Sequence, residues 1–518
     1  MSFSCYLVMQ AQTVNMSISL VHMLNWTNIS DGRPSVCKRN GFVEYTDQTS
    51  SPLVAWSPLM QSQILAALMY GMAAMYIPAE MIVSRVPYKW LPLLGTIMAS
   101  LCDFMIPTFA MMNGYLVVFV QILKTVSHSF IRPSFNLLIE QWVYKKSVHN
   151  YMSYGETGIF LSGFFIVLVA GILCATPEFG WEYVFYFTGS MGVIWCMVWF
   201  YFVSEYCFPT SFVFGSEPER KKKLQRKKIP WSGILTSTSI LAYVLVGMAY
   251  YSAFSFNVLL YPLYLKSVFG ATSEWITIAA AVPNLLAVYL FVIATFISER
   301  FVQSQVFEKV TVRKCCVILG LAPFATVNMF ITFTKCRKAL SSLIMMIGIG
   351  STSLAASALI NLPLDMSPDF AGLLTGIMHT VGALTGSFLP LLMGYLEESD
   401  EGIKYWNKVF NALTLLSIVA LVLFLAFGSC EIQHWDSNCT IHPYQVKNLR
   451  AEMVVPLIYK KSGDSEKIII PESKRKDLLG TKTVDKSKLA DILQSQSMRR
   501  TTESKPLKDY SSDDDTLI

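Results

Sequence analysis

Charged side chains are scarce in this sequence of 518 residues. Asp, Glu, Lys and Arg make up 15% of it, whereas hydrophobic residues make up 53%. Soluble globular proteins carry roughly 25% charged residues. The composition therefore excludes an ordinary soluble globular protein and indicates a chain that lies in lipid. The net charge is +6, but the basic surplus sits in a few loops and in the C-terminal region, so it does not indicate a nucleic-acid partner.

Enzyme motifs are also missing. The sequence contains no Gly-rich phosphate loop, no HExxH zinc pair and no GxSxG elbow. We expect no enzymatic activity, no cofactor and no metal site, and the lack of a phosphate loop argues against ATP hydrolysis as a power source.

Cysteines do not form a pattern of paired spacings. Most lie inside apolar runs, where a free thiol acts as a small buried hydrophobe; these include Cys102, Cys174, Cys196, Cys315 and Cys316. The sequence therefore predicts no disulfide framework.

Apolar runs of membrane-spanning length recur along the chain. A bilayer core of about 30 Å needs about 20 helical residues. The first run lacks a basic start and contains Gln10, Gln12 and Asn15, which favours a cavity-lining span over a signal peptide. We place twelve spans near residues 3–24, 62–83, 89–111, 115–142, 157–176, 183–203, 234–264, 274–298, 315–334, 340–362, 370–396 and 407–428.

Two breaks divide this series of spans. A basic loop follows the sixth span, and a polar region rich in Lys, Ser, Asp and Glu follows the twelfth. Two sets of six helices are typical of many secondary transporters. We therefore predict an all-α membrane protein with an N-terminal half (1–203), a cytoplasmic linker (204–233), a C-terminal half (234–429) and a disordered cytoplasmic tail (430–518).

Orientation follows from the placement of Lys and Arg, which are retained on the cytoplasmic side. More of them fall on the side of the basic linker, which places both termini in the cytoplasm and residues 25–61 outside. Asn25 and Asn28 in that outer loop begin glycosylation sequons, in agreement with this orientation. The sequon at Asn438 would be cytoplasmic and silent.

Several stretches resemble the anion:cation symporter branch of the major facilitator superfamily, the family of sialin, the vesicular glutamate transporters and the sodium-phosphate cotransporters. The matching stretches are Tyr70-Gly71, Ile77-Pro78, Gly180-Trp181, Val184-Phe185-Tyr186-Phe187-Thr188-Gly189, Ile229-Pro230-Trp231, Thr311-Val312-Arg313-Lys314, Leu364-Asp365-Met366-Ser367-Pro368, Ala371-Gly372, Gly376-Ile377, Phe427-Gly428-Ser429, Glu431-Ile432-Gln433 and Trp435. The resemblance implies a major facilitator fold and transport of an anion, coupled to Na⁺ or H⁺.

The chain departs from the family where substrate contacts are expected. It has Thr13, Gln121 and Tyr250 where the family or its glutamate transporters carry arginines, His128 where the family carries a glutamate, and Leu65 where the glutamate transporters carry a histidine. The resemblance therefore identifies a divergent member and leaves its substrate open.

Basic residues form a stripe on the fourth span. Lys124, His128 and Arg132 follow each other at intervals of four residues and share a helix face with Gln121 and Thr125. Ionisable groups in a span usually face the bundle interior. The stripe is either an anion site in a central cavity, with Lys124 and Arg132 as its main contacts, or a set of structural pairs with other helices.

The seventh span carries amphipathic aromatic residues. Tyr250, Asn257 and Tyr261 recur at helical spacing, as expected of a pocket that grips an organic solute. Tyr261 and Tyr264 fit an interfacial aromatic belt equally well. Pro262 should break the helix nearby.

Coupling and gating residues are further hypotheses. His128 has an unperturbed pKa of about 6.5, which suits proton coupling, although such a histidine is often only a hydrogen-bonded polar residue. Glu156 is a second proton or cation carrier, or else an interfacial partner of Lys145 or Lys146. The equivalent loops of the two halves carry Ser84 and Arg85, and Glu299 and Arg300, which we interpret as gating elements.

Two functions therefore remain open: transport of a small anion, or a membrane receptor that retains the transporter fold. The plasma membrane and endolysosomal or vesicular membranes are both possible locations. The C-terminal sequence from Asp513 to Ile518 matches an acidic dileucine signal for a sorting adaptor, and also a ligand for a PDZ domain.

Overall fold

A computed structural model of the protein describes residues 1–24, 54–83, 86, 90–143, 148–176, 178–205, 229–334, 336–399 and 403–436. The chain divides into two units, Met1–Cys439 and Thr440–Ile518, and all of the described residues belong to the first. Within the described ranges the structure is helical, apart from an isolated bridge between Leu24 and Val54. The predicted features at Asn25, Asn28, Ser84, Arg85, Asn438 and the C-terminal end lie outside these ranges.

Six spans form the N-terminal half. They are α1 (Ser2–Met23), α3 (Pro58–Val83), α4 (Leu91–Met112), α5 (Gly114–His128) continued by α6 (Ile131–Trp142), α7 (Val148–Ala175) and α8 (Trp181–Glu205). The helix α1 carries several polar residues, yet Gln12, Thr13 and Asn15 are each at most 1% exposed. Because α1 packs against α7 and α8, its polar side chains contact protein and not lipid.

Six further spans form the C-terminal half, after the short helix α10 (Trp231–Thr236). They are α11 (Thr238–Ser255) with η2 (Phe256–Leu260) and α12 (Tyr261–Phe269), α13 (Ser273–Gln303), α14 (Lys309–Phe330) with η3 (Ile331–Thr334), α15 (Lys338–Met366), α16 (Ala371–Ser399) and α17 (Ile403–Phe427). Eleven described helices are long and apolar enough to cross a membrane, and the enclosed α1 completes the predicted twelve.

Two spans are interrupted. The fourth breaks at Ser129 and Phe130, between α5 and α6, and Pro133 lies in the first turn of α6, where its missing N–H costs nothing. The seventh contains the π-helix η2, which ends at Leu260, two residues before Pro262; the hydrogen-bonding pattern changes there, but the helix continues into α12 and is not ended. Such local π-helical turns are frequent at functional sites.

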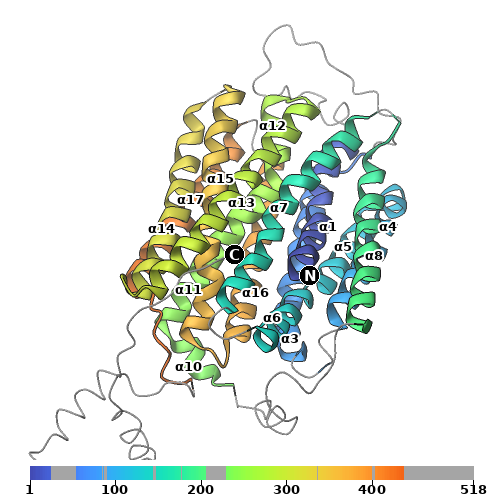
Figure 1. The fold of residues 1–518 in the computed structure, drawn as a ribbon. Helices are drawn as coiled ribbons and strands as arrows, with labels where there is room; N and C mark the ends of the chain where they lie inside the picture. The colour runs from blue at the N-terminus through green and yellow to red at the C-terminus, as the bar shows by residue number, and fades with distance from the viewer. Residues whose placement is uncertain are drawn as a thin grey trace, which may run out of the picture. The chain divides into compact units, whose positions relative to one another are not determined.

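The two halves contact each other through α3 on α16 and through α7 on α13 (Figure 1). Glycines allow this close approach: a Cβ added at Gly171 of α7 would lie 2.0 Å from Oγ1 of Thr277 of α13. Along α16, a Cβ at Gly372 would lie 2.6 Å from Glu80 Oε2, and one at Gly394 would lie 2.4 Å from Ser62 Oγ. The halves are therefore in contact near both ends of α16.

The cysteines differ in one respect from the prediction. Seven of the cysteines that the structure describes are free, and five of these are buried in the bundle: Cys5, Cys102, Cys174, Cys196 and Cys430. Cys336, however, is disulfide-bonded, so the expectation of no disulfide was wrong at this position. It lies in the turn between η3 and α15, outside the apolar runs on which that expectation rested.

Candidate functional site

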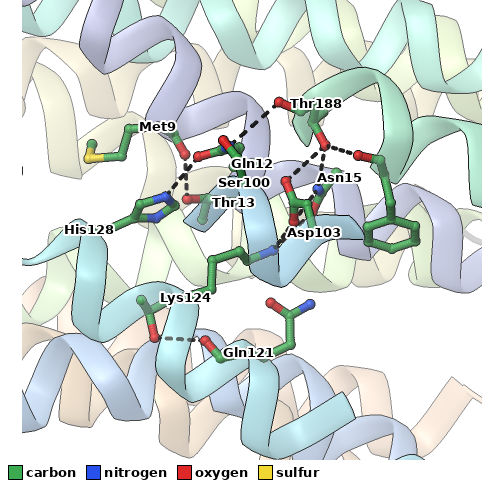
Figure 2. Close-up of polar contacts among 12 residues, drawn as sticks. Met9, Gln12, Thr13, Asn15, Ser100, Asp103, Gln121, Lys124, His128 and Thr188 are labelled. Carbon is green, nitrogen blue, oxygen red and sulfur yellow. Dashed lines mark hydrogen bonds and ion pairs between the residues drawn. The ribbon is translucent and has the colours of Figure 1, made fainter. Parts of the chain in front are cut away.

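A buried ion pair lies inside the N-terminal half (Figure 2). Lys124 Nζ of α5 is 3.0 Å from Asp103 Oδ1 of α4, and both side chains are fully buried. Lys124 also donates to Asn15 Oδ1 of α1 at 3.3 Å, and Thr188 of α8 donates to Asp103 Oδ2 at 3.0 Å. Four helices of one half therefore meet at a single pair of opposite charges.

A second set of polar contacts adjoins this pair. Gln12 donates to Ser100 Oγ at 3.0 Å, and its carbonyl oxygen lies 3.1 Å from His128 Nε2. Thr125 donates to the backbone carbonyl of Gln121 on its own helix, whereas the Gln121 amide is buried without a hydrogen-bond partner among the described residues. We call Gln12, Asn15, Ser100, Asp103, Lys124, His128 and Thr188 the N-half polar core.

A different group of residues joins the two halves. Arg132 Nη2 of α6 forms an ion pair with Glu156 Oε2 of α7 at 3.0 Å, and Arg132 Nη1 donates to His379 Nε2 of α16 at 3.5 Å. Because a guanidinium only donates, the opposite imidazole nitrogen carries the proton and donates it to the Tyr251 hydroxyl oxygen of α11. Arg132 and Glu156 belong to the N-terminal half, and His379 and Tyr251 to the C-terminal half.

Aromatic rings surround this ion pair. The Arg132 guanidinium lies 5.9 Å from the centre of the Tyr6 ring, and the Tyr76 ring stacks on His379 with ring centres 4.8 Å apart. The Tyr6 hydroxyl and Arg132 Nε are buried and have no hydrogen-bond partner among the described residues. We call Tyr6, Tyr76, Arg132, Glu156, Tyr251 and His379 the interfacial cluster; its two unpaired donors suit an anionic acceptor.

The break in span four lies between the members of the basic stripe, which contact two different groups of residues. Lys124 and His128 precede the break and contact the N-half polar core, whereas Arg132 follows it and contacts the interfacial cluster. Glu156 pairs with Arg132; Lys145 and Lys146, its other proposed partners, lie outside the described residues.

The span-seven residues lie at several levels of the C-terminal half. Tyr250 packs edge-on against Tyr251, with ring centres 5.8 Å apart, next to the interfacial cluster. Asn257 in η2 donates to Asn284 Oδ1 of α13 at 3.0 Å. Tyr261 and Tyr264 are at most 4% exposed and belong to a buried aromatic group with Trp406, so they do not form a lipid-facing belt.

The proposed gating residues of the C-terminal half have different surroundings. Glu299 accepts a hydrogen bond from Arg313 at 2.8 Å, and Arg313 also donates to Asp365 at 3.1 Å, so three buried charges link α13, α14 and α15. Arg300 is exposed and lies over the Phe296 ring of its own helix, 5.1 Å from its centre.

Seven residues of these two sites were not predicted as site residues from the sequence: Tyr6, Tyr76, Ser100, Asp103, Thr188, Tyr251 and His379. Asp103 and His379 are ionisable residues inside apolar spans, and such residues usually mark functional or paired positions. That signal was available for both. Tyr251 carries no comparable signal, because its neighbour Tyr250 fits the helical spacing of the span equally well.

The comparison with known families agrees with this architecture. The sequence profile of the Major Facilitator Superfamily matches residues 1–388 of this chain. The chain belongs to this superfamily. The match covers all of the N-terminal half and most of the C-terminal half, including both sites described above.

Curated relatives confirm the resemblance to the anion:cation symporter branch at low identity. The probable small intestine urate exporter of Mus musculus is 23% identical over 84% of this chain and 91% of its own length. Sodium-dependent phosphate transport protein 1 of Mus musculus is 24% identical over 83% of this chain and 92% of its own length. Sialin of Homo sapiens is 22% identical over 85% of this chain and 90% of its own length. The chain is therefore a divergent, multi-pass membrane transporter of this superfamily and not an enzyme.

Solved structures show the same fold. A D-xylose–proton symporter aligns with a TM-score of 0.57 at 10% identity, covering 83% of this chain and 96% of that one. A bacterial homologue of the human lysosomal transporter Spinster aligns with a TM-score of 0.54 at 13% identity, covering 82% and 95%. At these identities the likeness concerns the fold alone.

Proposed function

We propose that this protein transports a small organic or inorganic anion by alternating access, with Arg132 as the main anion contact and Glu156 as the carrier of a coupling proton. One observation carries the proposal: the ion pair of Arg132 and Glu156 contacts residues of both halves through His379. In transporters built from two repeats, the solute site lies at the repeat interface near the middle of the membrane. A site there is open to each side in turn.

The charges of the cluster favour a proton as the coupling ion. Arg132 and Glu156 neutralise each other, so an anion that binds Arg132 adds an uncompensated negative charge to a buried site. Protonation of Glu156 removes this charge and frees the guanidinium for bidentate contact with the anion. One proton would then accompany each negative charge, which makes transport of a monovalent anion electroneutral.

The relatives support an anion as the solute. Their names include urate, phosphate and glutamate among the transported compounds. The arginine positions of the family are replaced at Thr13, Gln121 and Tyr250, and in our proposal Arg132 supplies the positive charge from a different position on span four. The charge of Lys124 is already committed to Asp103, so we assign it no direct solute contact.

Topology and targeting are part of the same proposal. The excess of Lys and Arg on one side favours cytoplasmic termini and an outer loop that carries Asn25 and Asn28. Relatives named as an intestinal exporter and as vesicular transporters are compatible with a plasma or a vesicular membrane. Deleting residues 513–518 should redistribute the protein between these membranes if a sorting adaptor or a PDZ protein binds there; an unchanged distribution would rule out that role.

Uptake by purified protein in proteoliposomes tests the transport proposal. Phosphate, urate, glutamate and sialic acid are offered separately under an imposed proton gradient and then under an imposed Na⁺ gradient. We expect uptake of at least one anion that depends on the proton gradient and is lost in Glu156→Gln. Glu156→Gln should still exchange labelled for unlabelled anion, because a neutral side chain imitates the protonated glutamate.

A receptor that retains the fold is the second candidate, favoured by the loss of the family's arginines. It predicts saturable binding of an anion without net uptake or exchange. Binding measured by the anion's effect on thermal unfolding, together with flat uptake under both gradients, would support the receptor and refute transport of these solutes.

A further inference from the structure

Oxygen atoms of two helices converge on the buried ammonium of Lys124. Asp103 Oδ1 of α4 lies 3.0 Å from Nζ, and Asn15 Oδ1 of α1 lies 3.3 Å from it. Lys124 reaches this position from α5, on a side chain that is fully buried along its length. A carboxylate and an amide carbonyl are typical ligands of hard cations.

The hydrogen bonds behind these oxygens hold them toward the ammonium (Figure 2). Asn15 Nδ2 donates to Thr188 Oγ1 at 2.9 Å and to Asp103 Oδ1 at 3.1 Å, which turns the amide oxygen toward Lys124. Thr188 donates its own proton to Asp103 Oδ2 at 3.0 Å. The acceptor oxygens of Asn15 and Asp103 therefore face the Lys124 ammonium, and donors of Asn15 and Thr188 hold them in place. Groups around a bound ion orient its ligands in the same way.

We infer that these two oxygens form part of a monovalent-cation site that the Lys124 ammonium occupies permanently. A tethered ammonium supplies the positive charge that Asp103 requires, so an alkali ion has neither room nor charge to balance there. The native protein should therefore show no Na⁺ requirement at this site. This inference concerns only the N-half polar core and does not depend on which solute the interfacial cluster binds.

The competing explanation is an ordinary structural ion pair. Both explanations predict that the loss of Lys124 destabilises the protein, because an unpaired carboxylate remains buried. They differ in the effect that they predict for an added small cation. Lys124→Ala removes the side chain beyond Cβ and leaves polar space for an ion with its water, whereas a purely structural pair has no oxygen geometry that favours an ion.

The test measures the unfolding temperature of the purified full-length protein in choline chloride and in NaCl, LiCl or KCl at equal ionic strength. We expect no difference between these salts for the native protein. Lys124→Ala should unfold at a lower temperature in choline chloride and should regain a few degrees, saturably, in one or more alkali salts. The double variant Asp103→Asn, Lys124→Ala should lose that response, because it lacks the charged ligand.

The remaining outcomes are also decisive. A folded Lys124→Ala that does not distinguish alkali ions from choline would overturn the inference. So would an equal response in the double variant, because the ion would then bind elsewhere. If Lys124→Ala folds only when an alkali salt is present, the inference is supported. If Lys124→Ala does not fold in any of the four salts while the double variant does fold, the inference is overturned. Unfolding is measured without any solute, so the result is separate from that of the uptake test.

Discussion

Among the described residues of the N-terminal half, two ion pairs have different surroundings. Lys124 and Asp103 are both 0% exposed, and their hydrogen-bonding partners all belong to that half. The side chains of Arg132 and Glu156 are 16% and 11% exposed, and Arg132 also contacts His379 of the other half. The same chemistry, a basic side chain on span four with a carboxylate, is thus enclosed in one place and shared between halves in the other.

This difference separates a structural role from a functional one. When one half rocks against the other, contacts within a half persist and contacts across the interface must rearrange. The N-half polar core holds α1, α4, α5 and α8 together as one body. In our proposal the contacts of the interfacial cluster change during the transport cycle, so that an anion and a proton alter the balance between its states.

The largest effect should come from breaking the enclosed pair on one side. Lys124→Met leaves Asp103 buried and unpaired, so we expect the free energy of unfolding to fall by about 3–5 kcal/mol. Adding Asp103→Asn should restore most of this loss, because no charge then remains. Chemical unfolding in detergent measures both variants; losses that simply add would show that the two residues do not interact.

Breaking the shared pair should act on transport more than on stability. Arg132→Gln removes the anion contact, and we expect uptake to fall by about 100-fold, on the order of 3 kcal/mol. Arg132→Lys should keep a fraction of the activity, since an ammonium supplies charge but not bidentate geometry. Uptake is normalised to the amount of reconstituted protein, and Arg337→Gln, at an exposed arginine with no assigned role, serves as the matched control. Equal uptake in Arg132→Gln and the control would exclude this role for Arg132.

Neighbouring residues of the C-terminal half offer a smaller contrast. Glu299→Gln weakens a buried, charge-assisted hydrogen bond with Arg313, at an expected cost of about 1.5–3 kcal/mol in stability. Arg300→Gln should change stability by less than about 0.5 kcal/mol, because Arg300 is exposed. Thermal unfolding compares the stability of the two variants. A larger loss of stability for Arg300→Gln than for Glu299→Gln would contradict the assignment of the stabilising contact to Glu299.

The smallest effect concerns a single hydroxyl. Tyr251→Phe removes the acceptor for His379, and we expect uptake to fall about fivefold, or about 1 kcal/mol. Tyr264→Phe removes a similarly buried hydroxyl that lies 3.4 Å from Ser341 in the buried aromatic group, so it should leave uptake unchanged. Initial rates of uptake are measured for both variants. An equal loss of uptake in the two would show that removing a hydroxyl has no effect specific to the interfacial cluster.

Apolar run length was sufficient to predict the spans, because lipid imposes one length and one polarity on every helix. The errors occur where polar residues face protein. The helix α7 begins at Val148 and not near residue 157, since Ser153 and Glu156 are buried between helices and interrupt the apolar run without ending the helix. The change near Pro262 was predicted from the proline itself. The break at Ser129 was not predicted, although Pro133 cannot donate the helical hydrogen bond to the Ser129 carbonyl.

Pairings between helices could not be predicted from one sequence. Helical spacing correctly placed Lys124 on an inward face, but spacing does not say which helix lies opposite. The partner, Asp103, comes from α4. Arg132 shares the spacing of Lys124 and yet has another neighbourhood: it lies about two helical turns further along the span, beyond the interruption, and contacts α7 and α16.

The most direct test compares two double variants that each remove one complete ion pair. Both are charge-neutral, so neither leaves an unpaired buried charge: Asp103→Asn with Lys124→Met, and Arg132→Met with Glu156→Gln. Uptake per folded molecule is measured for both in the same proteoliposomes. We predict that the first variant transports within about threefold of the native protein and that the second, although folded, does not transport. Transport by the second variant and none by the first would contradict a structural role for the enclosed pair and a functional role for the shared one.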